Sequence, residues 1–135
     1  MTNSSGDFLL GKRRNSPAKG FLFFPGGRIF KNEKIENAIV RILREETGMV
    51  KTETNPEFIG VFEHFYEDNF CNERNPNSGT HYVALGFAIT IDSIPDQSAF
   101  LNQHSEMVWI SKIDLLSNPM VHEYCKEYFS RIDRT

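Results

Sequence analysis

The hydrophobic residues of this chain fall into short runs separated by polar stretches that contain glycine or proline. Apolar runs bounded by turn-forming residues predict β-strands. In residues 81–91 the pattern alternates, so that Val83 and Leu85 share one face of a strand and Tyr82 lies on the other. The predicted strands are residues 8–10, 21–24, 58–66, 81–91 and 107–110. The polar stretches 68–79 and 93–105 are predicted to be loops, and the first is long enough to suggest a binding role.

Residues 33–46 show helical rather than alternating spacing. Asn32 suits the N-cap position of this helix, and Gly48 suits its C-terminal stop. Its predicted buried stripe consists of Ile35, Ala38, Ile39, Ile42 and Leu43. Asn118 and Pro119 predict the start of a final helix. Its apolar face carries Val121, Tyr124, Cys125, Tyr128 and Ile132. The pattern predicts a single α+β domain over residues 1–135, with a mixed β-sheet sandwiched between helices.

One carboxylate of the first helix lies on its apolar side. At 100° per residue from Ile35, Glu46 falls at about 20°, in the middle of the buried stripe. Burying a carboxylate is costly unless a partner compensates it. One interpretation is that Glu46, in the last turn, simply turns to water. The other is a cation site, because Gly26 and Gly27 free the backbone to bring a carbonyl close, and Mg²⁺ prefers oxygen ligands.

The helix and the loop before it resemble the Nudix box, G-x5-E-x7-R-E-U-x-E-E-x-G-U. The matching residues are Gly27, Glu33, Arg41, Glu45, Glu46, Gly48 and Met49. The resemblance implies a Nudix fold, with Arg41 pairing with Glu33 or Glu45. Ile42 departs from the box, which has a glutamate there that would also point inward. Either Ile42 is only a better core residue in a site that has lost activity, or the site uses fewer carboxylates and fewer metal ions.

The chain resembles one Nudix branch in particular, the GDP-mannose mannosyl hydrolases. The similar segments are residues 6–13, 17–20, 24–28, 64–70, 80–83 and 103–104. The resemblance implies that water attacks the anomeric carbon of GDP-mannose, or also of GDP-glucose, and that GDP leaves with inversion. It implies Mg²⁺ as the cofactor, with Mn²⁺ as a substitute, and a homodimer as the assembly.

The same resemblance assigns a metal site and a base. The metal ligands would be Glu46, the carbonyl of Gly26 and Gln103, which also touches the substrate. The base would be His104, on the predicted loop before residues 107–110. Histidine titrates near neutral pH, which suits it to take a proton from water. By itself, a histidine in a loop is more often a surface residue.

Other residues are assigned to the substrate. Arg28 would assist catalysis by binding the departing diphosphate, and Arg13 and Tyr82 would bind the same group. Phe65 and Tyr66 are candidates for the nucleotide or sugar pocket, although core packing is the default interpretation. Weaker candidates for a role in the site are His64, His81 and His122.

The charge and the cysteine content of the chain limit the kinds of molecule that it is expected to bind. The formal net charge of −3 argues against non-specific binding of nucleic acid or membranes. Cys71 and Cys125 form no CxxC motif, which argues against a disulfide scaffold or zinc site and fits a reducing cytoplasm. No stretch is apolar enough to span a bilayer, and the first residues are unlike a signal peptide.

Two alternative functions remain open, because both the start of the chain and the Nudix box depart from the pattern of this branch. Nudix folds of this branch have a strand before the segment 6–13, where this chain has only residues 1–5, so the first strand is expected to be missing. Its loss would leave an open sheet edge and weaken the guanine site. One rival is an ordinary Nudix pyrophosphohydrolase that cleaves a nucleotide sugar or nucleoside triphosphate at phosphorus. The other is a binding module that has lost catalysis.

Overall fold

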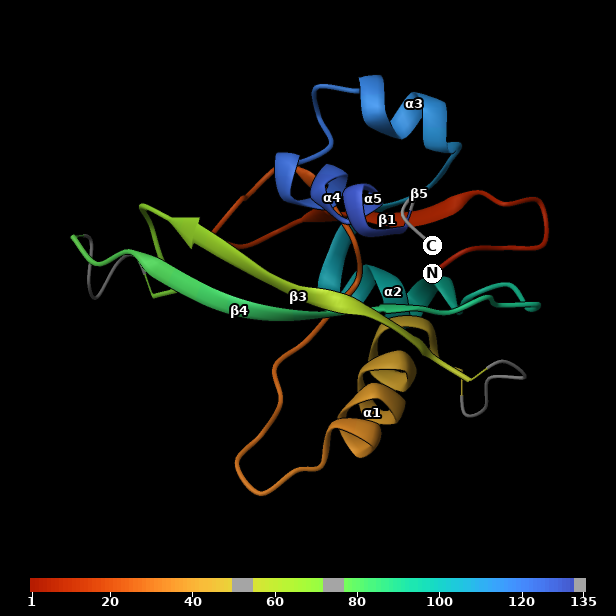
Figure 1. Ribbon diagram of the computed structural model, residues 1–135, viewed down its shortest axis with the longest axis horizontal. Coiled ribbons are helices and arrows are strands. Elements are labelled where there is room, and N and C mark those ends of the chain that lie inside the picture. The colour runs from red at the N-terminus through yellow and green to blue at the C-terminus, as the bar shows by residue number, and fades with distance from the viewer. Residues whose placement is uncertain (50–54, 72–76, 133–135) are drawn as a thin grey trace.

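The computed structural model describes residues 1–49, 55–71 and 77–132 (Figure 1). The strands are β1 (Phe8–Arg13), β2 (Leu22–Phe23), β3 (Glu57–Tyr66), β4 (Thr80–Ala88) and β5 (His104–Ile110). The helices are α1 (Ile35–Thr47), α2 (Gln97–Gln103), α3 (Lys112–Ser117), α4 (Glu123–Glu127) and α5 (Phe129–Ile132). All of the predicted strands and the first predicted helix are therefore present.

The strands form two antiparallel sheets that the N-terminal residues connect. One sheet has the order β2-β1-β5, and the other is the long hairpin-like pair β3-β4. Thr2 forms an antiparallel bridge with Phe8 and a parallel bridge with Thr90, beyond the end of β4. This combination of parallel and antiparallel pairing gives the mixed character expected of the sheet. The first strand of the described chain is β1, and the residues before it contribute isolated bridges.

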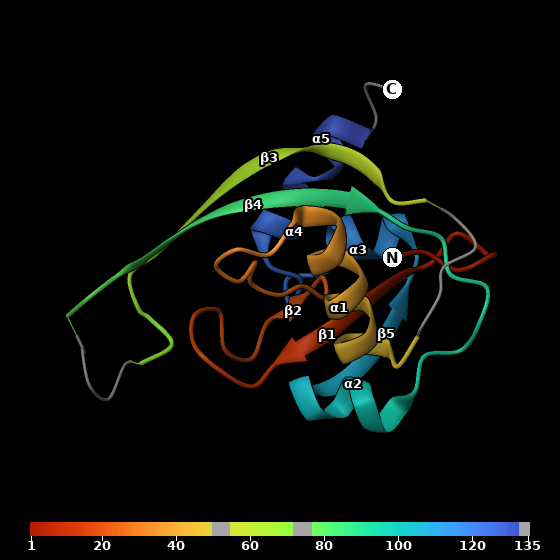
Figure 2. The same ribbon diagram turned by 90° about the horizontal axis from the view of Figure 1, so that it is seen from below.

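Helices lie on both sides of the β3-β4 pair, with α1 on one side and α4 and α5 on the other (Figures 1 and 2). Phe62 of β3 stacks on Tyr128, which joins α4 and α5, with ring centroids 4.2 Å apart. A Cβ at Gly86 of β4 would lie 2.8 Å from the Tyr128 ring, so glycine permits this close packing. The predicted α+β sandwich is confirmed.

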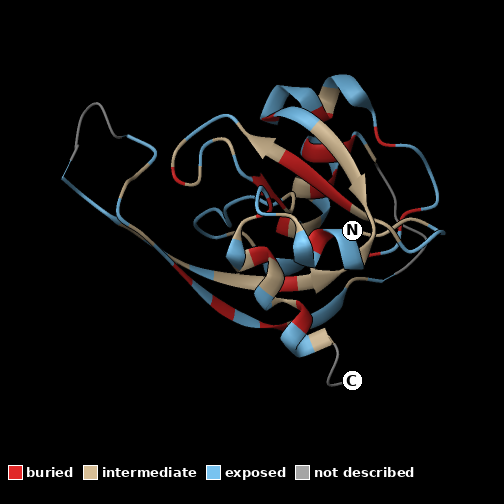
Figure 3. Cartoon of the chain, turned by 90° about the horizontal axis from the view of Figure 1, so that it is seen from above, coloured by how far each residue is buried: buried red, intermediate tan, exposed pale blue. Residues whose placement is uncertain are grey.

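The main hydrophobic core lies between β1, β2 and the C-terminal helices. It contains Leu10, Leu22, Phe23, Leu115, Val121, Cys125 and Phe129. Figure 3 shows the buried residues on the central strands and helices, with exposed loops around them. Burial of these apolar side chains supplies the main driving force for this arrangement.

The two ends of α1 differ from each other in how well they were predicted. At the C-terminal end, Gly48 adopts the left-handed conformation with φ 73°, as a C-terminal glycine stop requires. At the N-terminal end the prediction was wrong, because Lys34 occupies the N-cap position. Asn32 has a positive φ of 66° in the preceding turn. The Glu33 carboxylate accepts the backbone N–H of Phe30 at 3.0 Å, which stabilises this turn.

The buried stripe of α1 is shorter than predicted. Ala38 and Leu43 are buried, but Ile35 is 46% exposed, and Ile39 and Ile42 are only partly covered. The first turn of α1 extends away from the sheets (Figure 1), which agrees with the partial exposure of Ile35. The C-terminal half of the helix carries the contacts to the rest of the fold.

The predicted loop 93–105 contains a helix that the apolar pattern did not reveal. Asp96 caps α2, and its side chain accepts the backbone N–H groups of Ser98 and Ala99 at 2.9 and 3.3 Å. His104 follows directly as the first residue of β5, so its prediction as a loop residue was wrong. Both ends of this segment are therefore fixed by secondary structure.

The C-terminal helix also starts later than predicted. After a turn that ends at Met120, Val121 forms a bridge with Leu22 of β2. Leu22 donates to the Met120 carbonyl at 2.8 Å and accepts from His122 at 3.1 Å. Pairing with β2 therefore delays the helix that Pro119 was predicted to begin. The predicted final helix consists of α4 and α5, and α3 lies before it, capped by Ser111.

Of the predicted binding loop 68–79, residues 72–76 lie outside the described residues. The described ends are held together where Thr80 donates from its hydroxyl to the Asp68 carbonyl at 2.6 Å. No described helix is both long enough and apolar enough to cross a membrane.

Candidate active site

Glu46 and His104 meet in the interior, although 58 positions separate them in the chain. Glu46 Oε2 lies 2.6 Å from His104 Nε2, and the two residues are 5% and 6% exposed. Glu46 therefore does face the core, and the interpretation that it turns to water is wrong. The imidazole is the partner that compensates this buried carboxylate.

The contact with Glu46 indicates which nitrogen of His104 is the donor. A carboxylate accepts hydrogen bonds, so Nε2 donates to it. His104 Nδ1 is buried and has no hydrogen-bond partner among the described residues. The ring thus has one unpartnered nitrogen in the interior.

Two residues hold the imidazole of His104 from opposite directions. Phe100 of α2 stacks on it, with ring centroids 4.4 Å apart and an angle of 27°. Gly11 of β1 contacts it so closely that a Cβ there would lie 2.3 Å from Nδ1. Neither Gly11 nor Phe100 was predicted to belong to the site, although a glycine inside a strand indicates close approach of another group.

A direct connection between α1 and α2 brings the pair together. The backbone N–H of Asp96 donates to the carbonyl of Thr47 at 2.8 Å. A Cβ at Gly48 would lie 2.9 Å from the Cβ of Asp96, and φ is also positive there. The residue that ends α1 therefore also allows α2 to begin beside it, which places Glu46 and His104 in reach of each other.

Arg41 organises the outer side of α1, as the sequence predicted. Its Nε and Nη2 donate to the two Glu33 oxygens at 2.8 and 2.9 Å, and its Nη1 donates to Glu45 at 3.1 Å. It also donates to the Arg28 carbonyl and lies over the Phe30 ring at 3.8 Å. The hydrogen bonds from Arg41 lower the pKa of Glu33 to about 2. Arg41 thereby ties the 28–33 loop to the helix.

The loop before α1 leaves space around Gly26 and none around Gly27. No atom lies within 4 Å of a Cβ built at Gly26, whereas one at Gly27 would lie 2.8 Å from Ile42 Cγ1. Ile42 thus packs against the loop where the box would place a glutamate. The Arg28 guanidinium lies 5.8 Å from the centre of the Phe70 ring.

The remaining predicted residues lie near the ends of the strands. Arg13 pairs with His104 in the β1–β5 register, which places the two backbones side by side. The Arg13 Nε donates to the Pro17 carbonyl at 2.7 Å. Tyr82 contacts Tyr66, with ring centroids 6.2 Å apart. Gln103 is exposed at the end of α2, adjacent to His104 in the chain.

The chemistry of the ligands that the sequence predicts suits a single hard cation. Within the described ranges, no three side chains of His, Cys, Asp or Glu converge as a metal site. The predicted set instead combines Glu46 with the Gly26 carbonyl and the Gln103 amide, all oxygen donors of the kind that Mg²⁺ prefers. Glu46 Oε2 bonds to His104, which leaves Oε1 for a cation.

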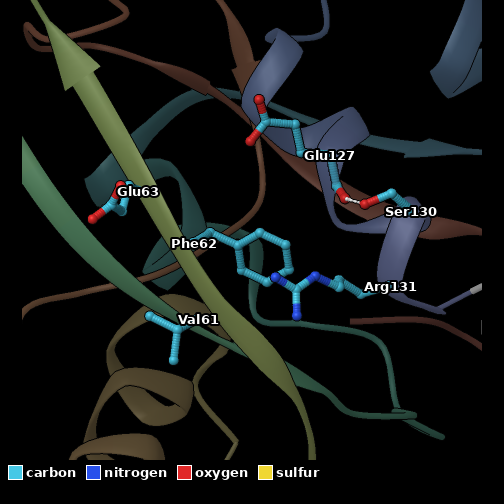
Figure 4. A pocket seen from close by; sticks show the side chains of 6 residues that line it. All are labelled: Val61, Phe62, Glu63, Glu127, Ser130 and Arg131. Carbon is cyan, nitrogen blue, oxygen red and sulfur yellow. Dashed lines mark hydrogen bonds between the residues drawn. The ribbon is translucent and has the colours of Figure 1, made fainter.

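A surface cavity of about 450 Å³ lies elsewhere, between β3 and the C-terminal helices (Figure 4). It is lined by Val61, Phe62, Glu63, Glu127, Ser130 and Arg131. None of the predicted site residues is among them. The chemistry that the sequence predicts is therefore concentrated at Glu46 and His104 and not at this cavity.

The chain is similar in sequence to known Nudix proteins, as the residues of its box predict. The family model described as NUDIX domain matches residues 1–129. Low-salt glycan biosynthesis protein Agl8 of Haloferax volcanii is 34% identical over 128 residues, 95% of this chain and 75% of that protein. The ADP-ribose pyrophosphatase of Methanocaldococcus jannaschii is 48% identical over 83 residues, 62% of this chain and 43% of that protein. The chain thus spans three quarters of one relative and less than half of the other.

Among solved structures, the MutT protein from Methanosarcina mazei has a similar fold. Its TM-score is 0.73 at 23% identity, covering 98% of this chain and 87% of that chain.

Proposed function

The chain belongs to the Nudix family, and from this premise we propose that it hydrolyses GDP-mannose to GDP and mannose by attack of water at the sugar carbon. The observation that carries the proposal is the buried pair of Glu46 and His104 at 2.6 Å. In this pair a histidine, which is able to act as a base, lies beside the inward carboxylate of the box. Ile42 fills the position of the second inward carboxylate, so fewer metal ligands are present than attack at phosphorus ordinarily uses in this family.

The proposed role of His104 is to take a proton from the attacking water. An inverting displacement at a sugar carbon needs a base on the side opposite the leaving group. In the present arrangement Nε2 bonds to Glu46, and Nδ1 is buried against Gly11. For His104 to act as the base, its contact with Glu46 must open when substrate binds, and Nε2 must present its lone pair to the water while the ring hydrogen lies on Nδ1.

The leaving group is a diphosphate, which departs readily when its negative charge is compensated. Arg28 and Arg13 would donate charge-assisted hydrogen bonds to its oxygens, and the Tyr82 hydroxyl would add a neutral one. Mg²⁺, or Mn²⁺ in its place, held by Glu46 with Gly26 and Gln103, would supply further positive charge at the same oxygens. These groups replace the general acid that ordinary glycosidases require.

The two relatives favour different aspects of the reaction, one a class of substrate and the other a cleaved bond. The glycan biosynthesis protein of Haloferax volcanii matches nearly the whole chain, which favours a nucleotide sugar. The ADP-ribose pyrophosphatase matches a shorter segment at higher identity, which favours cleavage between the phosphates. A pyrophosphohydrolase acting on a nucleotide sugar is therefore the second candidate function.

Analysis of the products separates the two. Purified protein with Mg²⁺ and GDP-mannose should yield GDP and mannose, whereas GMP and mannose 1-phosphate would refute attack at carbon. In water enriched in oxygen-18, attack at carbon places the label in mannose and none in GDP. GDP-glucose, tested in parallel, measures how selective the sugar site is.

A second test addresses the base. Gln in place of His104 can still donate a hydrogen bond to Glu46 but cannot take up a proton. We expect His104→Gln to lower turnover by roughly a hundredfold while GDP affinity stays within about twofold. Unchanged turnover would remove His104 from this role, whatever the products are.

A further inference from the structure

We propose that the His122 imidazole donates a hydrogen bond from Nε2 to a phosphate oxygen of the nucleotide, beside Arg13. The inference rests on the part of the proposed function that places a nucleoside diphosphate in this site. It does not depend on which bond is cleaved. His122 is the N-cap residue of α4.

The contacts of His122 fix which nitrogen carries its proton. The Tyr124 backbone N–H donates to His122 Nδ1 at 3.1 Å, so Nδ1 must present its lone pair. Burial lowers the pKa of His122, which favours the neutral ring. A neutral ring that accepts at Nδ1 carries its hydrogen on Nε2. No described residue accepts a hydrogen bond from that nitrogen.

Arg13 and His122 both lie beside the ring of Phe23, and Tyr66 lies beside His122. The Arg13 guanidinium carbon lies 5.9 Å from the Phe23 centroid, and the His122 ring lies 5.3 Å from it. The ring of Tyr66 lies 5.7 Å from that of His122. The three residues come from the end of β1, the end of β3 and the start of α4. Segments distant in sequence therefore converge on one place.

Most of the hydrogen-bond donors of these three residues have no acceptor among the residues that the structure describes. Among the residues that the structure describes, no carboxylate pairs with Arg13, whose Nε alone is used by the Pro17 carbonyl. Burial raises the pKa of Tyr66, so its hydroxyl stays protonated. The Tyr66 hydroxyl, like His122 Nε2, has no described partner. The cluster of Arg13, Tyr66 and His122 thus has several unused N–H and O–H groups.

A cluster of this kind selects one part of a nucleotide sugar. Phosphate oxygens only accept hydrogen bonds, and a guanidinium matches their charge. A guanine edge or a sugar hydroxyl also donates, and it would need a carboxylate or carbonyl that this cluster does not present. Tyr66 also touches Tyr82, which is itself expected to bind the diphosphate. The cluster therefore extends that binding site as far as His122.

The role of His122 as a helix cap must be separated from binding. Asparagine is a good N-cap residue, so His122→Asn keeps an acceptor for the Tyr124 N–H and removes the Nε2 donor. His122→Ala removes both. We expect the melting temperature of His122→Asn to stay near that of the natural protein and that of His122→Ala to fall.

The binding experiment uses GDP and Mg²⁺ with titration calorimetry, so that no turnover is needed. We expect His122→Asn to weaken GDP binding by roughly tenfold, as for the loss of one hydrogen bond to a charged group. Ser111→Asn is the matched control, because Ser111 caps α3 as His122 caps α4 and asparagine keeps the cap acceptor, and it should leave GDP affinity unchanged.

The outcomes distinguish this inference from the proposed function. If His122→Asn binds GDP as tightly as the natural protein, or if the natural protein binds no GDP, the inference is overturned. If GDP binding weakens but the products are GMP and mannose 1-phosphate, the inference stands and the proposed function fails.

Discussion

We expect Gly11→Ala to disturb the contact between Glu46 and His104 without changing either of these side chains. The added Cβ would lie 2.3 Å from His104 Nδ1, whereas ordinary contacts begin at 3.4 Å. The imidazole must therefore move by about 1 Å, or β1 must move by as much. Phe100 stacks on the ring at 4.4 Å and restricts its movement. A shift of this size would disrupt the 2.6 Å hydrogen bond with Glu46, whose geometry tolerates only a few tenths of an ångström.

The expected cost follows from the bond that is lost. A hydrogen bond to a charged group contributes about 1.5–3 kcal/mol. Replacing glycine by alanine reduces the entropy of the unfolded chain, which returns about 0.4–1 kcal/mol. The net loss of unfolding free energy is therefore roughly 1–2 kcal/mol, or a melting temperature lower by roughly 3–8 °C for a domain of this size. Turnover should fall as well, because His104 leaves its position.

Denaturant unfolding and thermal melting measure the effect, with Gly26→Ala as the matched control. A Cβ at Gly26 meets no atom within 4 Å, so that variant should be as stable as the natural protein. In a protein that already carries His104→Ala, the same Gly11→Ala change should cost far less, because the ring is absent. If Gly11→Ala alone melts within a degree of the natural protein and keeps its turnover, the reasoning about this pair is refuted.

Three further predictions concern α1 and β3. Ile42→Glu places a second carboxylate one turn from Glu46, so we expect a lower melting temperature in chelator and a larger rise with Mg²⁺ than in the natural protein, measured by thermal shift. Arg41→Gln should return the pKa of Glu33 from about 2 toward its ordinary 4.5, which a carbon-13 NMR titration of that carboxyl would show. Burial lowers the pKa of His64 to about 4 from 6.5, so the unfolded chain binds its proton first as pH falls. The free energy of unfolding should therefore drop by about 1 kcal/mol between pH 7.5 and 5.5, and His64→Phe should remove this loss.

The sequence predicted α1 and its inward carboxylate well, because a long amphipathic helix has a strong periodic signal. The position of Glu46 relative to its neighbours depends only on the helical repeat. The exposure of Ile35 could not be predicted in this way, because it depends on how far the sheets extend beneath the first turn. The N-cap was wrong for a similar reason, since Glu33 makes its contacts with Phe30 and Arg41 across the turn.

The segment around His104 was harder to predict. Helix α2 has only seven residues, and Phe100 is its single buried side chain, so no repeating apolar pattern marks it. Its start depends on the Asp96 cap and on the bond from Asp96 to Thr47, a contact between distant parts of the chain. The resemblance to a known family identified His104, but only the structure shows that Gly11 and Phe100 hold it.

The substitution at Ile42 and the pairing of Glu46 with His104 have one physical explanation. Two inward carboxylates one turn apart would repel each other, and metal ions would have to compensate their charge. With Ile42 packed against Gly27, Glu46 is left as one buried carboxylate, and a single imidazole donor is enough to stabilise it. For the same reason, Glu46→Ala should damage the site in a way that added Mg²⁺ cannot repair, because it leaves both nitrogens of His104 buried without a partner.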